Sequence, residues 1–265
     1  MIPGVWTAAS RQFAAPSNDP NGGGSRNRVM TILASLNPGY RALIFGASGG
    51  IGRAIRARLE SDPACVAAIA VSRRGEHGVD ITDEAMVADA AARLARQFGH
   101  FDLIFNATGA LTIDTIGPEK SLRAIDPTAM ARQFAVNAIG PALLLKHFSP
   151  LLPKERRSMF ASLSARVGSM GDNRLGGWMS YRASKAAQNQ IVRTAAIELG
   201  RTHPQAVVVA LHPGSVKTPL SEPFARGHDR MTPEQSASLM LLTLDGLTPA
   251  ESGGFFAYDA SRIEW

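Results

Sequence analysis

Leu43-Ile-Phe-Gly46-Ala-Ser-Gly-Gly50-Ile-Gly52 joins a short apolar run to a helical pattern through a glycine-rich turn. Ile51, Ile55 and Leu59 then recur at the spacing of one helix face, so the segment predicts a strand, a tight turn and a helix. Backbone N–H groups and the positive end of the helix would face the turn, which is an arrangement that binds phosphate. The turn lacks the Lys-Ser/Thr pair of a nucleoside-triphosphate loop, and this argues against triphosphate chemistry.

The rest of the chain repeats the alternation of short apolar runs with longer helical patterns, which predicts βαβ units and a parallel sheet. The expected strands cover residues 43–45, 66–71, 78–81, 102–105, 157–163, 206–211 and 255–258. The expected helices cover residues 51–60, 83–98, 128–147, 180–200 and 233–245. The sequence therefore predicts a single doubly wound α/β domain of Rossmann type, with about seven parallel strands and helices on both faces.

Composition limits the classes of protein to which the chain can belong. Residues 1–29 lack apolar periodicity, so we expect a disordered extension before a domain that covers 30–265, with Met30 as an alternative translation start. The formal charge is +6, but Lys and Arg are scattered, and no nucleic-acid partner is expected. One cysteine, Cys65, and the absence of a membrane-length apolar run or secretory signal predict a cytoplasmic protein with no metal site.

The end of the second expected strand bears on cofactor choice. An acidic residue there would bind the ribose hydroxyls of NAD, but the chain has Ser72-Arg73-Arg74. A guanidinium pairs well with a 2′-phosphate, so Arg73 or Arg74 predicts a preference for NADP(H) over NAD(H). The alternative is a solvated pair of arginines at a strand end.

Tyr181-Arg-Ala-Ser-Lys185 places a phenol and an ammonium one helical turn apart on one face. An ordinary tyrosine has a pKa of about 10, and a nearby ammonium lowers that pKa by favouring the phenolate. Tyr181 could then exchange a proton with an alcohol or carbonyl oxygen while hydride moves between substrate carbon and nicotinamide. Such a pair alone is more often a solvated helix face. Together with the glycine turn, it predicts nicotinamide-dependent carbonyl or alcohol chemistry.

Several motifs, in order, resemble those of the short-chain dehydrogenase/reductase family over most of the chain from Arg41 to Trp265. The matching segments are Gly46–Gly52, Asn106-Ala-Thr-Gly109, Asn137, Tyr181 with Lys185, and Pro213-Gly214-Ser-Val216-Lys-Thr218. Within the family, residues 164–169, 172–178 and 211–214 look most like the C-factor branch, which is named for a bacterial signalling protein and also resembles the carbonyl reductases.

This resemblance implies roles for individual residues. Tyr181 would exchange the proton, Lys185 would contact the ribose and lower the pKa of the phenol, and Asn137 would hold a relay water. Asp80 and Ile81 would meet the adenine. The implied cofactor site consists of Gly46, Ser48, Gly49, Gly50, Ile51, Gly52, Arg73, Asp80, Ile81, Asn106, Ala107, Gly109, Lys185, Pro213, Gly214, Val216 and Thr218. A substrate loop at about 217–232 is also implied, as is a homodimer or homotetramer paired through helices 128–147 and 180–200.

The family also has a serine that polarises the substrate carbonyl, and here the match is incomplete. The aligned pair is Ser164-Ala165, so the second hydroxyl is missing, and counting back from Tyr181 by the family's usual interval reaches Gly168. Ser164 is the preferred candidate, with Ser162 behind it. The alternative is that these strand-end serines satisfy backbone groups.

The sequence thus predicts an NADP(H)-dependent oxidoreductase that acts on a small carbonyl compound or secondary alcohol, with Tyr181 as proton donor or acceptor. The alternative is a C-factor-like signalling or nucleotide-sensing protein that has the same fold and little or no turnover.

Overall fold

The computed structural model describes residues 31–224 and 229–265. The extension predicted for 1–29 and the possible start at Met30 lie outside the described residues. Within the described residues, none of the helices is both long enough and apolar enough to cross a bilayer.

In the described part of the chain, six parallel strands form one sheet in the order β2-β1-β3-β4-β5-β6. The strands are β1 (Tyr40–Phe45), β2 (Cys65–Val71), β3 (Leu103–Asn106), β4 (Ser158–Leu163), β5 (Ala206–His212) and β6 (Phe255–Ala257). The strand order reverses between β1 and β3, so a crevice opens beyond the carboxyl ends of these two strands. The predicted doubly wound fold is confirmed.

The strand predicted at 78–81 is wrong, which leaves six strands rather than about seven among the described residues. Gly78 makes only an isolated parallel bridge to Ser72. The chain then turns, because Asp80 Oδ1 accepts hydrogen bonds from the N–H and the hydroxyl of Thr82. This aspartate turn leads directly to Asp83, which caps the next helix, so the segment cannot extend the ladder.

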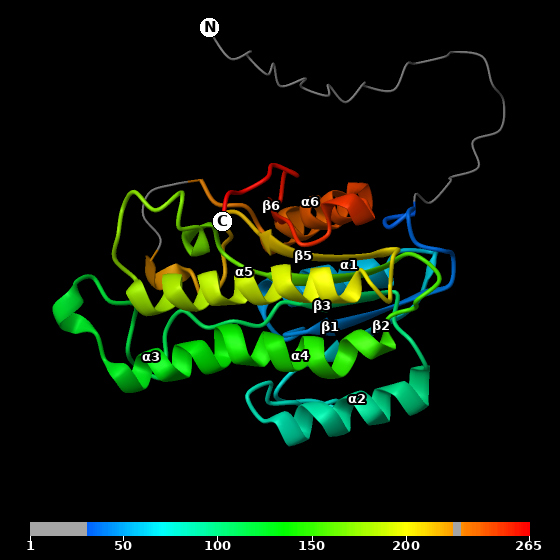
Figure 1. The fold of residues 1–265 in the computed structure, drawn as a ribbon, viewed down its shortest axis with the longest axis horizontal. Helices are drawn as coiled ribbons and strands as arrows, with labels where there is room; N and C mark the ends of the chain where they lie inside the picture. The colour runs from blue at the N-terminus through cyan, green and yellow to red at the C-terminus, as the bar shows by residue number, and fades with distance from the viewer. Residues whose placement is uncertain (1–30, 225–228) are drawn as a thin grey trace, which may run out of the picture.

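Helices cover both faces of the sheet. They are α1 (Gly50–Glu60), α2 (Glu84–Phe98), α3 (Pro127–Phe134), α4 (Gly140–Phe148), α5 (Met179–Leu199) and α6 (Pro233–Gly246). Ala42 and Ile44 pack in one core with α1 and α6, whereas Leu43 and Phe45 pack in the other with α2, α4 and α5. Figure 1 shows α6 on one side of the strands and α2 and α4 on the other. The alternation of side chains along the strands thus builds the two layers.

The long helix expected at 128–147 is interrupted. A π-helical turn at Ala135–Ile139 separates α3 from α4 and contains Asn137. Such turns insert one extra residue and often occur at functional sites. Short 3₁₀ helices lie at Leu122–Ala124, Ser149–Leu151, Arg166–Gly168, Glu222–Phe224 and Pro249–Glu251.

Candidate active site

The carboxyl ends of the central strands border a cleft made of two adjoining cavities, of about 610 Å³ and 440 Å³. Ser48, Gly49 and residues 107–109 line both cavities, so the two are parts of one cleft. The first is also lined by Gly46, Arg73, Asp80 and Ile81, and the second by Gly50, Ile51, Gly52, Ser164, Tyr181, Lys185, Pro213 and Thr218. Most of the predicted site residues therefore meet where the strand order reverses.

The glycine turn is shaped to admit a phosphate group. Gly46 has a φ of 74°, and a Cβ at Gly52 would lie 2.3 Å from the carbonyl oxygen of Gly46, so neither position tolerates a side chain without strain. No side chain caps the start of α1, and its first turn has no acidic residue. The positive end of the helix is therefore open to an anion, and the turn fits the pyrophosphate of a dinucleotide.

Arg73 and Arg74 differ in position, although the sequence could not separate them. Arg73 lines the first cavity together with Asp80, whereas Arg74 is absent from the lining. The pKa of Asp80 is lowered, chiefly because its carboxylate accepts hydrogen bonds from Thr82, with a smaller contribution from the charge of Arg73. An ionised Asp80 thus lies near an exposed guanidinium at the outer end of the cleft.

Tyr181 lies in the first turn of α5, and a distant glutamate anchors that turn. The Trp178 N–H donates to the carbonyl oxygen of Glu119, and the N–H of Ser180 donates to Glu119 Oε2 at 3.2 Å. The Ser180 hydroxyl donates to the other carboxylate oxygen. Trp178 has a left-handed backbone with φ 55° and gives no side-chain cap of its own. Glu119 therefore takes the place of a cap and, as an anion at a helix N-terminus, stabilises the turn that carries Tyr181.

Lys185 is buried and lines the second cavity. Its Nζ donates to the carbonyl oxygen of Leu163 at 2.9 Å and to Gln188 Oε1 at 2.8 Å, and it lies 6.0 Å from the centre of the Tyr181 ring. Burial lowers the pKa of Lys185 to about 7. Burial also raises the pKa of the Tyr181 phenol above its usual value. With its pKa raised by burial, the Tyr181 phenol holds its proton at neutral pH, and the lowering of that pKa by Lys185 stays a prediction.

Asn137 is locked between the loop after β3 and α5. Its Oδ1 accepts a hydrogen bond from the N–H of Ala110 at 2.9 Å, and its Nδ2 donates to the carbonyl oxygen of Ala110 at 2.8 Å and to Ser184 Oγ at 3.2 Å. Asn137 does not line either cavity. A Cβ on Gly109, however, would lie 3.4 Å from both Asn137 Oδ1 and Lys185 Nζ. The π-helical turn therefore brings this amide close to the lysine.

The structure separates the candidate serines. Ser164 lines the second cavity with Tyr181, but its hydroxyl donates to Asn189 Oδ1 at 2.6 Å. Ser162 is fully buried, and its oxygen accepts hydrogen bonds from Asn106 and Gln188. Gly168 packs so tightly against α5 that a Cβ would lie 2.8 Å from the Cβ of Lys185. Ser164 thus faces the cleft, although its proton is directed to a protein acceptor.

Three further predicted cofactor residues do not line either cavity. Asn106 turns its amide into the sheet toward Ser162 and accepts hydrogen bonds from Thr108. Gly214, with φ 78°, has no room for a side chain beside Met231 and Tyr258. Val216 is buried and bridges to Met231. In this structure these residues shape the loops that carry the lining residues.

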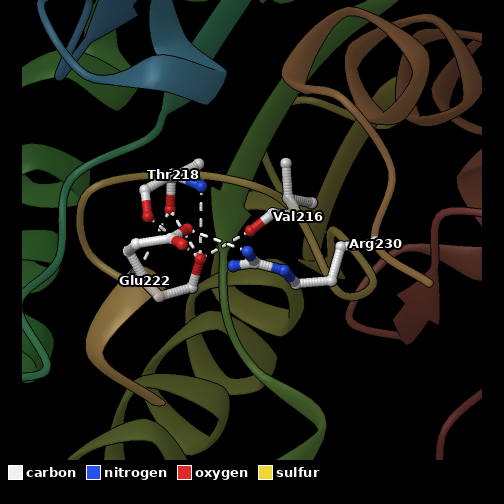
Figure 2. Close-up of polar contacts among 5 residues, drawn as sticks. Val216, Thr218, Glu222 and Arg230 are labelled. Carbon is white, nitrogen blue, oxygen red and sulfur yellow. Dashed lines mark hydrogen bonds and ion pairs between the residues drawn. The ribbon is translucent and has the colours of Figure 1, made fainter. Parts of the chain in front are cut away.

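The loop after Val216 is held by a polar network (Figure 2). The Ser221 hydroxyl donates to the carbonyl oxygen of Val216 at 2.5 Å and accepts a hydrogen bond from the N–H of Thr218 at 3.2 Å. The N–H of Glu222 donates to the carbonyl oxygen of Thr218, and its carboxylate pairs with Arg230 at 2.8 Å. This network fixes Thr218 at the cleft. Of the predicted substrate loop 217–232, residues 225–228 lie outside the described residues.

Several site contacts were missed from the sequence. Gln188 lies three positions after Lys185, so helical spacing could have placed it on the same face. Ser184 lies three positions after Tyr181, so the same spacing places it on this face, where it accepts a hydrogen bond from Asn137. Glu119 is 61 residues from Ser180, and no local pattern points to that contact.

Comparisons with known proteins identify the family of the chain. The family model described as short chain dehydrogenase matches residues 40–229. A protein of Rhodococcus sp. (strain AD45) named 1-hydroxy-2-glutathionyl-2-methyl-3-butene dehydrogenase is 33% identical over 234 residues, which cover 84% of this chain and 98% of that protein. C-signal of Myxococcus xanthus is 34% identical over 168 residues, which cover 63% of this chain and 94% of its own length.

Solved structures show the same fold. NADPH-bound carbonyl reductase from chicken fatty liver aligns with a TM-score of 0.75 at 22% identity, over 87% of this chain and 96% of that one. A short-chain dehydrogenase/reductase from Burkholderia multivorans with bound NADP aligns with a TM-score of 0.69 at 25% identity, over 86% and 100% of the two chains. With the family match over 40–229 and a relative that spans most of its length, the chain belongs to the short-chain dehydrogenase family and is an oxidoreductase.

Proposed function

We propose that the protein is an NADP(H)-dependent oxidoreductase that transfers hydride between the nicotinamide and a small carbonyl compound or secondary alcohol. The observation that carries the proposal is that Tyr181 and Lys185 line the same cavity as Gly50 and Gly52 of the glycine turn. A nicotinamide cofactor bound there would supply hydride to the substrate carbon or take it from an alcohol. The chain itself must then supply or accept a proton at the substrate oxygen.

Tyr181 is the proposed proton donor and acceptor. Its phenol is buried and holds its proton at neutral pH, so in the reducing direction it can donate to the carbonyl oxygen as that oxygen gains charge. Lys185 is proposed to contact the cofactor ribose with an N–H that its two protein acceptors leave unused, and Asn137 to hold a relay water near it. Ser164 is proposed as a second contact of the substrate oxygen, but its hydroxyl would have to turn away from Asn189.

The cofactor is proposed to lie along both cavities. Its pyrophosphate would meet Gly46, Ser48, Gly49, Gly50, Ile51 and Gly52, and its adenosine would meet Arg73, Asp80 and Ile81. Its nicotinamide half would meet Ala107, Gly109, Lys185, Pro213 and Thr218, while Asn106, Gly214 and Val216 would support the loops that carry these residues. Arg73 would pair with the 2′-phosphate and so favour NADP(H) over NAD(H). The bound NADP and NADPH of the similar structures support this choice.

We propose an uncharged substrate for the second cavity, which Arg53 also lines. Beside Tyr181, the cavity is lined by the apolar side chains of Leu163, Pro219 and Leu220. A small carbonyl compound can place its apolar part against these residues and its oxygen against the phenol. Likeness to C-signal keeps the signalling alternative in view, but it is not favoured, because Tyr181, Lys185 and Asn137 are assembled beside one cavity.

We also propose a homodimer or homotetramer in the cytoplasm. A groove of about 780 Å³ lies between the outer surfaces of α4 and α5 and is lined by Leu145, Ile191 and Ala195 among others. A second copy of the chain could bury these residues by pairing the same two helices. Light scattering after gel filtration tests this, because Ala195→Arg should convert an oligomer to a monomer. A monomer before the substitution would contradict the pairing.

The function is tested by measuring cofactor consumption with a panel of aldehydes, ketones and quinones. The proposal predicts NADPH oxidation with at least one class of carbonyl compound, and slower oxidation of NADH at equal concentration. Tight NADPH binding without turnover on any compound would instead support the signalling alternative.

A further inference from the structure

Gln188 is a buried amide on the face of α5 that carries Tyr181 and Lys185. It lies one helical turn after Lys185 and two turns after Tyr181, so the three side chains share a face. Its exposed fraction is 0%. Burying an amide costs free energy unless it is hydrogen-bonded, so we expect both the oxygen and the nitrogen of this amide to have partners.

The surrounding groups allow only one orientation of this amide. The carbonyl oxygen of Leu163 can only accept a hydrogen bond and lies on one side of the amide, so Gln188 Nε2 must face it and Gln188 Oε1 faces Lys185 Nζ at 2.8 Å. Gln188 Nε2 then donates to Ser162 Oγ at 2.7 Å and to the carbonyl oxygen of Leu163 at 3.0 Å. Leu163 also accepts from Lys185, so Gln188 and the carboxyl end of β4 hold the ammonium from two sides.

We propose that Gln188 is a positioning residue that orients Lys185 toward the cofactor cleft and keeps its amine in the charged form. Lys185 has three N–H donors, of which Leu163 and Gln188 take two, and the third is left for the cleft. An apolar side chain of similar length could fill the space without the cost of burying an amide. The amide therefore adds its hydrogen bonds to Lys185, Ser162 and the Leu163 carbonyl. This inference rests on the proposed role of Lys185.

The neighbours of Lys185 make its charge sensitive to this contact. The groups around Lys185 Nζ from other elements are the Leu163 carbonyl of β4, Gly109 in the loop after β3 and the Asn137 amide of the π-helical turn. All three groups are neutral. Tyr181 is the titratable side chain beside it. Burial lowers the pKa of Lys185 to about 7, with no charged residue as a cause. The neutral acceptor Gln188 Oε1 favours the ammonium form of Lys185. Loss of this acceptor should therefore lower the pKa of Lys185 further, and a carboxylate in the same place should raise that pKa.

The test is a heteronuclear NMR titration of the lysine side chains in the full chain. Five lysines are present, and Lys185→Met assigns the signal of interest. The variants are Gln188→Met, which removes the acceptor at similar volume, and Gln188→Glu, which replaces it by a charge. Gln190→Met is the matched control, because Gln190 is exposed on the same helix and its amide bonds to Thr194.

The proposal predicts that the pKa of Lys185 falls by about one unit in Gln188→Met, rises in Gln188→Glu and stays unchanged in Gln190→Met. The alkaline limb of kcat/KM should move in the same directions. An unchanged Lys185 titration in either folded Gln188 variant would overturn the proposal and leave Gln188 as a packing residue. If Gln188→Met does not fold, the near-isosteric Gln188→Glu alone decides. The NMR titration measures the pKa of Lys185 whether or not the protein turns over a substrate. Failure of this proposal can therefore be distinguished from failure of the proposed function.

Discussion

Replacement of Arg73 by alanine should change cofactor preference more than any other single substitution on the adenosine side of the cleft. Arg73 lines the first cavity, and its neighbour Arg74 does not, although the two side chains have the same chemistry. A hydrogen bond to a charged group contributes about 1.5 to 3 kcal/mol, or roughly 10-fold to 150-fold in Kd. The guanidinium is exposed, so solvent and salt weaken its hydrogen bond to the phosphate. We therefore expect the Kd for NADPH to change by about tenfold, at the lower end of this range.

The assay is a fluorescence titration of the unmodified protein, Arg73→Ala and Arg74→Ala with NADPH and with NADH at fixed ionic strength. We expect the Kd for NADPH to rise about tenfold in Arg73→Ala, with little change for NADH, which lacks the 2′-phosphate. Arg74→Ala should leave both values nearly unchanged. Equal weakening of NADPH and NADH by Arg73→Ala, or the same effect from Arg74→Ala, would refute the assignment of Arg73 to the 2′-phosphate.

Three further substitutions test the geometry of the cleft and its surroundings. Ser164→Ala should lower kcat/KM by about 10²-fold, the loss typical of a donor to a developing oxyanion, because Ser164 is the proposed second contact of the substrate oxygen. A loss of less than about tenfold would show that its hydroxyl stays on Asn189. Gly52→Ala puts a Cβ 2.3 Å from a carbonyl oxygen, so it should lower the free energy of unfolding by about 1 to 3 kcal/mol and abolish tight NADPH binding. Urea and NADPH titrations measure the two effects. Gly246→Ala is the control and should cause neither effect, because a Cβ there meets open space. Burial lowers the pKa of His212 to about 4, so between pH 6.5 and 4 only the unfolded chain binds this proton, and stability should fall as the pH drops through that window by up to about 3 kcal/mol. Urea titrations of His212→Asn should show a flatter pH dependence, and an unchanged slope would argue against a neutral imidazole at His212 in the folded chain.

Local patterns were enough to predict most of the fold. Runs such as 206–211 are apolar throughout because β5 is covered on both faces, and the glycine turn places Gly46 and Gly52 where a Cβ cannot fit. The strand expected at 78–81 failed because the hydrogen bonds from Thr82 to Asp80 turn the chain there. The π-helical turn at Asn137 also went unpredicted, since one extra residue per turn hardly disturbs a helical pattern.

The positions of candidate site residues could be predicted only where a motif sets their spacing. Tyr181 and Lys185 follow from helix spacing, and the cleft contains both. The direction of the Ser164 hydroxyl depends on Asn189, which lies on a different element, and the anchor at the start of α5 comes from Glu119 in a distant loop. Such contacts depend on how strands and helices pack, and no pattern within one segment encodes them.

The central claim is that Tyr181 exchanges the proton in a cleft that binds NADPH. The most direct measurement compares kcat and the Kd for NADPH between the unmodified protein and Tyr181→Phe, with the best carbonyl substrate of the panel. Loss of the phenol hydroxyl should lower kcat by about 10²-fold or more while the Kd for NADPH stays nearly the same. Undiminished turnover by Tyr181→Phe would contradict the account.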